Sequence, residues 1–166
     1  MRGYSLFETL VSVFIFSLLA LAMAGIFNAS QESIDWNYQE LALQKELRRT
    51  LAAMTQEIRE SSPSSPVPIT IGTNTLSFQI PSSISANLVT GWTLVSYGLG
   101  SNATATRTAN GQTTTLGSDI QALNFIYPVN AQTSPRTVQI QITGSRNTLK
   151  RNITLTLTGQ VTLRNQ

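Results

Sequence analysis

Glu8 is a carboxylate set at the start of an apolar segment, in the stretch GYSLFETLVSVF. No charged residue occurs from Thr9 to Gln31, and the residues from Leu10 to Phe27 are overwhelmingly apolar. A charge of either sign inside a bilayer costs roughly 2.5–3.5 kcal/mol unless it is paired. The chemistry that Glu8 offers is therefore charge pairing with a cation at the same depth.

Residue types that enzymes use for catalysis are scarce. The chain has no Cys and no His, which excludes thiolate chemistry, imidazole bases, disulfides and the usual zinc sites. Residues 61–166 carry six bases and one acid, Asp119, whereas the seven other acids lie within residues 1–60, along an expected helix. Paired carboxylates for acid–base catalysis are therefore missing from the second half. We expect neither an enzyme nor a bound cofactor or metal.

A short motif surrounds Glu8. Residues 1–3 form a basic leader that ends in Gly3, and Tyr4-Ser5-Leu6-Phe7-Glu8 follows. This stretch resembles the N-terminus of the type IV pilin-like family, in which Glu stands at the fifth position after the Gly. The resemblance implies that a prepilin peptidase cleaves between Gly3 and Tyr4 and methylates the new amino group of Tyr4. Tyr stands where Phe or Met is more usual.

The resemblance also implies a role for Glu8. Cleavage would create a cationic amine at Tyr4, and Glu8 would be its counter-charge on a neighbouring subunit of a helical filament. Residues four apart share a helix face, so Tyr4 and Glu8 of one chain are also within reach of each other. An unpaired Glu8 favours association, and Glu8 is therefore the expected assembly contact.

Residues 4–27 are expected to form the transmembrane and assembly half of a helix. At 1.5 Å per residue this segment approaches the ~30 Å thickness of the hydrocarbon layer. Two alternatives remain. The segment could be a plain single-span anchor with Glu8 at the head-group level, or a secretory signal cut after Ala22-Met23-Ala24, so that the mature chain begins at Gly25. The apolar run exceeds the ~7–15 residues of a signal core, which favours an anchor.

Residues 28–60 are expected to continue this helix as an amphipathic half. No Pro occurs between Tyr4 and Glu60, and prolines at positions 63, 66 and 68 then end the helix. Five apolar residues recur at helical spacing and form a stripe that a sheet must cover: Leu43, Leu47, Leu51, Met54 and Ile58.

Residues 61–166 are expected to form an antiparallel β-sheet domain. Apolar and polar residues alternate in several segments, and most clearly from Ile153 to Leu163, which indicates a sheet with one buried and one wet face. The polar stretch from Ser101 to Gly117 is predicted to be a long exposed loop or hairpin. The expected fold class is α+β, a pilin-like fold with a long N-terminal helix packed on an antiparallel β-sheet.

The order of apolar residues in the predicted strands is similar to that of minor pseudopilins of the J type from type II secretion and of related minor pilins. This resemblance implies a structural subunit of a pseudopilus or pilus, spanning the inner (cytoplasmic) membrane once, with its C-terminal domain outside the cytoplasm. The implied partners are other pilin or pseudopilin subunits, the prepilin peptidase, the inner-membrane assembly platform and membrane lipid. The motifs concerned are Ile120-x-x-Leu123-x-Phe125-x-Tyr127, Pro135-x-x-Val138-x-Ile140-x-Ile142 and Leu163-Arg164-Asn165.

A basic cluster of Arg146, Lys150 and Arg151 is expected in the turn before the last strand. Such a cluster could attract DNA phosphates, and the protein would then be a DNA-uptake or adhesive minor pilin. No aromatic residue is interleaved with these bases to stack on single strands, so a solvated turn is the favoured interpretation. A single carboxylate, that of Asp119, is too few to hold a calcium ion, and we expect Asp119 to form part of a turn beside Ser118.

Overall fold

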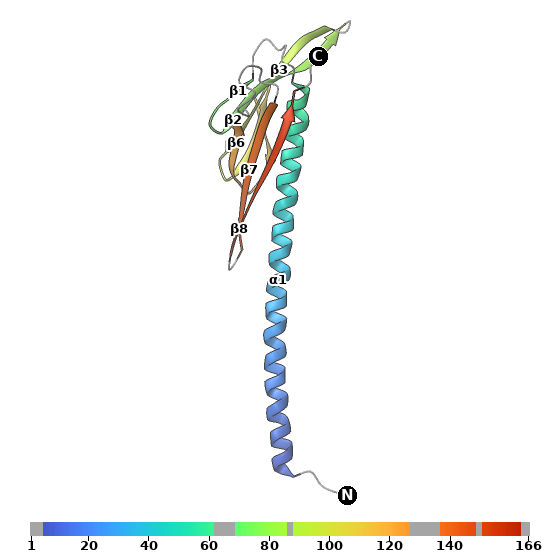
Figure 1. Ribbon diagram of the computed structural model, residues 1–166, viewed down its shortest axis with the longest axis vertical. Coiled ribbons are helices and arrows are strands. Elements are labelled where there is room, and N and C mark those ends of the chain that lie inside the picture. Colours follow the sequence, from blue (N-terminus) through green and yellow to red (C-terminus); the bar gives the residue numbers. More distant parts are fainter. Residues whose placement is uncertain (1–4, 62–68, 86–87, 127–136, 149–150, 164–166) are drawn as a thin grey trace. The chain divides into compact units, whose positions relative to one another are not determined.

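The structure is a computed structural model that describes residues 5–61, 69–85, 88–126, 137–148 and 151–163 of the chain (Figure 1). It divides into two compact units, Met1–Gln39 and Glu40–Gln166. The described part of the first unit is almost entirely helical. The second unit contains the C-terminal part of the same helix and all of the described strands.

Helix α1 spans Leu6–Glu60, a run of 55 residues. The prediction of one continuous helix ending at Glu60 is thereby confirmed. Ser61 closes its C-terminal end, because the backbone nitrogen and the hydroxyl of Ser61 both donate to the carbonyl oxygen of Ile58, at 3.0 and 2.6 Å. These two bonds satisfy a carbonyl that has no partner further along the helix.

The strands form two antiparallel sheets, whereas a single sheet was expected. Strands that follow one another in the sequence pair with one another throughout each sheet. Alternation of apolar and polar residues reveals which face of a strand is buried but not where one sheet ends and the next begins. The five-stranded sheet contains β1 (Thr70–Ile71), β2 (Thr75–Ser85), β3 (Leu88–Gly100), β4 (Thr104–Ala109) and β5 (Gln112–Gly117), and the three-stranded sheet contains β6 (Ile120–Ile126), β7 (Thr137–Asn147) and β8 (Asn152–Thr162).

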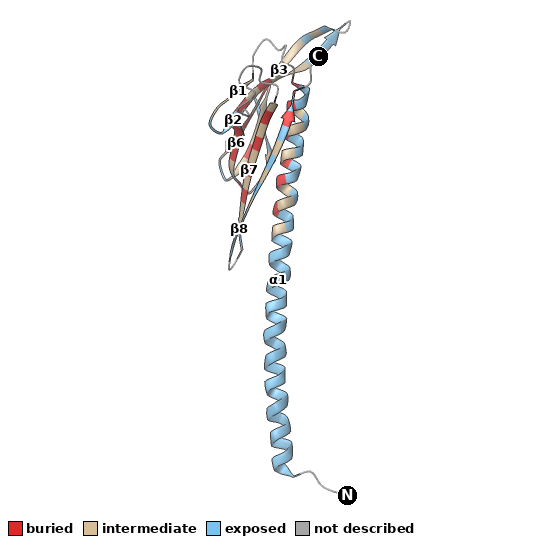
Figure 2. Ribbon diagram, in the orientation of Figure 1, coloured by how far each residue is buried: buried red, intermediate tan, exposed pale blue. Residues whose placement is uncertain are grey.

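The predicted apolar stripe of α1 lies in the core of the second unit. Leu43, Leu47, Met54 and Ile58 are fully buried, and Leu51 is half-buried (Figure 2). Burying one such side chain stabilises the fold by about 1.5–3 kcal/mol. The stripe packs with the inward residues of both sheets, so the predicted alternation in the strands is largely confirmed: Leu76, Phe78, Val95, Tyr97, Leu123, Phe125, Val138, Ile140, Ile142, Ile153 and Val161.

The stretch from Ser101 to Gly117 contains the β4–β5 hairpin, which confirms the hairpin form of the prediction. Ala109 pairs with Gln112, so Asn110 and Gly111 are the two residues of the turn. Their φ angles are +52° and +75°. A two-residue turn with positive φ at both positions matches the right-handed twist of the flanking strands, and Asn-Gly is the sequence that favours it.

Gly144 on β7 lies against α1 and against the turn that contains Asp119. A Cβ atom at this position would lie 2.8 Å from Leu47 Cδ2 and 3.0 Å from both Leu43 Cδ1 and the backbone oxygen of Asp119. The two leucine side chains can shift by a few tenths of an ångström, but the backbone oxygen cannot move without disturbing its turn. The absence of a side chain at Gly144 therefore permits the backbone of Asp119 to approach this strand closely.

We expect Gly144→Ala to lower the free energy of unfolding by about 1–2 kcal/mol, because the added methyl group overpacks this contact. Urea titration of the full chain in detergent micelles measures the effect. The matched control is Gly98→Ala, where the added Cβ atom would come no closer than 3.5 Å to any of its neighbours. Equal stability of the two variants would show that the backbone approach at Gly144 is not tight.

Candidate membrane-insertion and assembly site

Glu8 lies in the first turn of α1, which Ser5 caps. The backbone nitrogen of Phe7 donates to Ser5 Oγ at 3.2 Å, and the backbone nitrogens of Glu8 and Thr9 donate to the carbonyl oxygen of Ser5 at 2.9 and 3.2 Å. Ser5 is thus the N-cap and Glu8 the third helical residue, the positions of a capping box. A carboxylate there also lies favourably beside the positive end of the helix dipole. Local helix structure therefore offers its own explanation for Glu8, besides charge pairing.

The helix that follows exposes apolar side chains on every face. Its most apolar 18-residue window has a mean hydropathy of 2.6, and none of that window is buried (Figure 2). Leu6, Phe7 and Phe16 are 83%, 74% and 75% exposed. The helix is long and apolar enough to cross a membrane. Lipid or other helices must cover a surface of this kind, because soluble proteins rarely leave such an apolar area in water.

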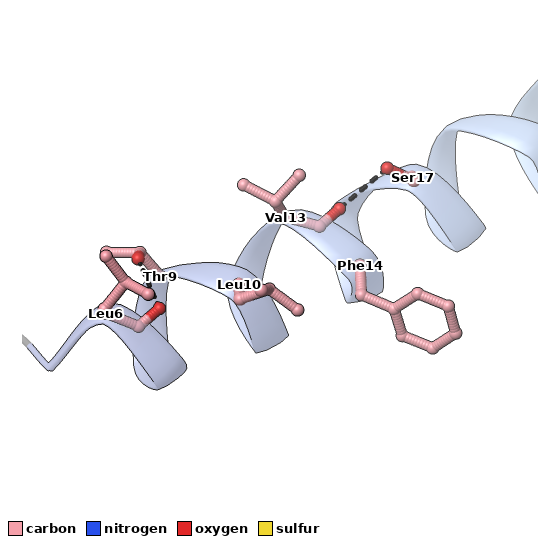
Figure 3. A pocket seen from close by; sticks show the side chains of 6 residues that line it. All are labelled: Leu6, Thr9, Leu10, Val13, Phe14 and Ser17. Carbon is pink, nitrogen blue, oxygen red and sulfur yellow. Dashed lines mark hydrogen bonds between the residues drawn. The ribbon is translucent and has the colours of Figure 1, made fainter.

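Hydroxyl groups within this apolar segment find partners in their own helix. Thr9 donates to the carbonyl oxygen of Leu6 at 2.8 Å, Ser12 to that of Glu8 at 2.8 Å, and Ser17 to that of Val13 at 2.7 Å. Two of these bonds are visible in Figure 3. Because these hydroxyls already donate within their own helix, they need no further partner in a hydrocarbon environment, which offers none. The carboxylate of Glu8, by contrast, forms no ion pair with any residue that the structure describes.

A shallow groove runs along one side of the same turns of α1 (Figure 3). Its walls are side chains of a single helix, three or four residues apart, so nothing encloses it. An elongated apolar neighbour, such as an acyl chain or another helix, fits such a surface better than a small polar molecule. The lining residues are Leu6, Thr9, Leu10, Val13, Phe14 and Ser17.

Of the three site residues predicted from the sequence, the structure describes Glu8. The predicted processing residues Gly3 and Tyr4 lie outside the described residues. Glu8 is exposed, and it stands at the fifth position after Gly3, so its carboxylate is accessible to a partner from another chain.

A charged cluster that the sequence analysis missed lies in the second unit. Arg107 on β4 donates through Nε to both carboxylate oxygens of Glu57 on α1, at 3.0 and 2.9 Å. The Arg107 Nη2 atom and the Tyr97 hydroxyl also donate to this carboxylate. The side chains of Arg107 and Glu57 are only 27% and 18% exposed. The cluster thus joins the helix to two strands of the five-stranded sheet.

The ionisation of this cluster follows from its contacts. Burial raises the pKa of Glu57, but hydrogen bonds from Arg107 and Tyr97 and the charge of Arg107 outweigh burial and leave that pKa below its ordinary value. Burial and the hydrogen bond to Glu57 raise the pKa of Tyr97 well above its ordinary value, and the hydrogen bond to Glu57 raises the pKa of Arg107. None of the three groups is tuned to exchange a proton near neutral pH. The cluster acts as a structural clamp.

Two sequence signals point to this clamp in retrospect. Glu57 follows Met54 by three residues, which places an acid at the border of the buried stripe. Arg107 is the single charged residue between Ser61 and Ser118. An isolated base in a strand and an isolated acid beside an apolar stripe can both avoid solitary burial by pairing.

The predicted basic cluster is not assembled as expected. Arg146 lies in β7 and not in the turn that follows, because β7 continues to Asn147. Its Nε and Nη2 atoms donate to Asp119 Oδ2 at 2.9 and 2.5 Å. Asp119 serves the turn between β5 and β6, as predicted, with φ of +60° and a carbonyl oxygen that accepts a bond from the Ser145 nitrogen at 2.8 Å. Arg151 is exposed, and Lys150 lies outside the described residues.

Potential metal ligands do not cluster in the described part of the chain. No group of three or more His, Cys, Asp or Glu side chains comes together there. The ion pairs Glu57–Arg107 and Asp119–Arg146 each join residues far apart in the sequence, and their roles follow from packing.

We expect Arg107→Met to lower the free energy of unfolding by about 2 kcal/mol, because Glu57 would remain half-buried without its counter-charge. Adding Glu57→Gln should restore part of this loss, since a neutral amide costs less to bury. Urea titration in detergent micelles measures all variants. Arg49→Met, on the exposed side of α1, is the control and should change stability by less than about 0.5 kcal/mol. If Arg107→Met cost no more than this control, the clamp would contribute nothing to stability.

Comparisons with known proteins give no relative of this chain, since no protein-family model, no curated protein and no solved structure matches it.

Proposed function

We propose that this protein is a membrane-anchored structural subunit of a helical filament, most like a minor pseudopilin of a type II secretion-like or type IV pilus machine. The observation that carries the proposal is an uncovered apolar helix with a carboxylate in its first turn, at the fifth position after Gly3. The hydroxyl groups described in that segment find partners in their own helix. The carboxylate of Glu8 is left to bind something outside it.

A cationic amine on Tyr4 is the partner that fits best. In hydrocarbon, an ion pair replaces two costly solitary charges. Each copy of the cleaved chain would carry one amine, on Tyr4, and one carboxylate, on Glu8. The amine of one copy would pair with the carboxylate of the next. A contact of this head-to-tail kind can be repeated indefinitely and generates open helical assemblies. One processing event per chain would then be enough to start filament growth.

The second unit supports the same proposal. There α1 buries its stripe and Thr50, and among the described residues the exposed side of the helix and the wet faces of both sheets are available to meet other subunits. In this proposal the first unit inserts in the inner membrane, and the sheet domain lies outside the cytoplasm. Prepilin peptidase and the inner-membrane assembly platform would act on the membrane-inserted form.

Neither alternative gains support from a specific observation. For a DNA-uptake pilin, two of the bases that could contact phosphates, Arg107 and Arg146, are already held in ion pairs with Glu57 and Asp119. For a secreted β-domain with a cleaved signal, the fold is compatible, but the mature chain would begin at Gly25. The start of the mature chain therefore separates the filament proposal from the secreted β-domain. Salt-dependent DNA retention that is lost when Arg146, Lys150 and Arg151 are neutralised would instead identify a DNA-uptake pilin.

We expect the mature chain, purified from its native membrane, to begin at N-methylated Tyr4. Intact-mass and N-terminal peptide mass spectrometry measure this directly. Gly3→Leu should leave an uncut chain, because the peptidase would no longer find its glycine. A mature chain beginning at Gly25, or an uncut wild-type chain beginning at Met1, would overturn the filament proposal.

Variants of Glu8 distinguish charge pairing from helix capping. Glu8→Gln keeps a capping-box side chain but removes the charge, whereas Glu8→Asp keeps the charge on a shorter side chain. We expect Glu8→Gln and Glu8→Ala to insert in the membrane normally and to be absent from sheared filaments, and Glu8→Asp to be incorporated at a reduced level. Immunoblots of membrane and filament fractions measure both steps. Normal incorporation of Glu8→Gln would show that the charge of Glu8 is not used in assembly.

A further inference from the structure

The five-stranded sheet extends into a two-stranded arm, formed by Pro81–Ser85 of β2 and Leu88–Leu94 of β3. Strand β4 pairs with β3 only from Val95 to Gly100, and β1 pairs with β2 only at Leu76 and Ser77. Beyond these points, the described residues of the arm pair only with each other. Figure 1 shows this β2–β3 arm projecting past the end of its sheet.

The arm exposes apolar residues and carries no charge. Ile84, Leu88 and Leu94 are 66%, 71% and 52% exposed. No charged residue occurs anywhere from Ser61 to Thr106. Proteins usually protect exposed sheet edges with charged side chains, and a two-stranded ribbon alone is only marginally stable in water. These features are typical of a strand that another strand covers.

The two edges of the arm differ. On β2, Pro81 lacks a backbone N–H, and the register shifts at Ser82. Proline and bulges are both devices that discourage pairing at an edge. On β3 there is no proline; its one irregularity is Thr90, which faces no residue of β2 and whose hydroxyl lies 3.0 Å from that of Ser83. Each strand thus carries one register shift, and only β2 also carries a proline. Among the described residues, the edge of β3 is therefore the more open one to a further strand.

The sequence of this edge places one leucine three residues to either side of Gly91: Leu88-Val89-Thr90-Gly91-Trp92-Thr93-Leu94. If two copies pair antiparallel with Gly91 opposite Gly91, each exposed Leu88 faces Leu94 of the other copy. Val89 then faces Thr93, and Thr90 faces Trp92. The register covers both exposed leucines of each copy and places no charge in the contact.

Gly91 suits the centre of such a contact. A Cβ atom there would lie 2.4 Å from Ser83 Oγ and 2.7 Å from Ser82 Oγ, so any larger residue would force both serine hydroxyls to move. Without a side chain at the two-fold axis, two twisted strands can cross closely.

We propose that the β3 edge of the arm, Leu88–Leu94, pairs antiparallel with the same edge of a second copy of this chain. The contact is two-fold symmetric and closes at two copies, which separates it from the repeating contact proposed for Glu8. Seven residues per copy make a small interface, so pairing in dilute solution should be weak. A shared membrane raises the local concentration of the partner, and this step rests on the proposed anchor.

Cysteine cross-linking of the full chain in its membrane tests the register. The chain has no Cys, so single-cysteine variants have no background. Leu88→Cys and Leu94→Cys, carrying different tags, are expressed together and oxidised mildly. Opposite residues of antiparallel strands have Cα atoms about 4.5–5.5 Å apart, which permits a disulfide, whereas the two copies of residue 88 would lie about 20 Å apart. We expect the mixed disulfide dimer, which joins the two variants, in at least tenfold excess over the dimer of Leu88→Cys with itself.

The matched control pairs Ile84→Cys with Leu94→Cys. Ile84 is nearly as exposed as Leu88 and lies on the same arm, but on β2, the strand with the proline, so this pair should not cross-link. The mixed dimer of Leu88→Cys and Leu94→Cys should persist in the Glu8→Ala background. Equal yields for all pairs, or loss of the mixed dimer with Glu8→Ala, would overturn the two-fold contact. Filament incorporation of Glu8→Ala would contradict the proposed function alone.

Discussion

A charge in apolar surroundings needs a counter-charge, and this constraint acts at both ends of α1. Near the C-terminal end, Glu57 meets it within the chain, through Arg107 and Tyr97. Near the N-terminal end, Glu8 meets no ion-pair partner among the described residues, although Ser5 and the helix dipole stabilise its turn. Where the chain supplies both charges, as at Glu57, the pair is a clamp; where it supplies one, as at Glu8, we propose that the charge is a site for association. A carboxylate on α1 can take part in a clamp only where a strand beside the helix supplies its counter-charge.

Helix α1 also meets two different requirements with one backbone. In the first unit apolar side chains cover every face, and the hydroxyls bond to their own helix, as a hydrocarbon solvent demands. In the second unit only one stripe is apolar, and both sheets cover it. The change of pattern occurs without a proline or a break in the helix. Because an α-helix satisfies its own backbone groups, only the side chains need to change between the two surroundings.

The parts of this structure that a single residue pattern determines could be predicted from the sequence. Helical spacing of Leu43, Leu47, Met54 and Ile58 predicted the buried face, and alternation predicted the strands. Pairing between distant residues could not be predicted, because local pattern carries no information about which strand lies beside which. The Glu57–Arg107 clamp, the position of Arg146 in β7 and the division into two sheets all depend on such pairing. Glu8 stood out because its mismatch with the apolar segment is local.

The two contacts proposed for this chain differ in symmetry, and this difference constrains when each can form. All subunits of a polar filament point the same way, so a two-fold contact between arms cannot be repeated along it. If both proposals hold, a two-fold pair would belong to copies that lie in the membrane and have not been incorporated. The arm contact is short and uncharged, whereas the Glu8 contact gains strength in hydrocarbon, where a solitary charge is costly. The weaker contact would then yield to the stronger one, and paired subunits would form a reserve from which the filament grows.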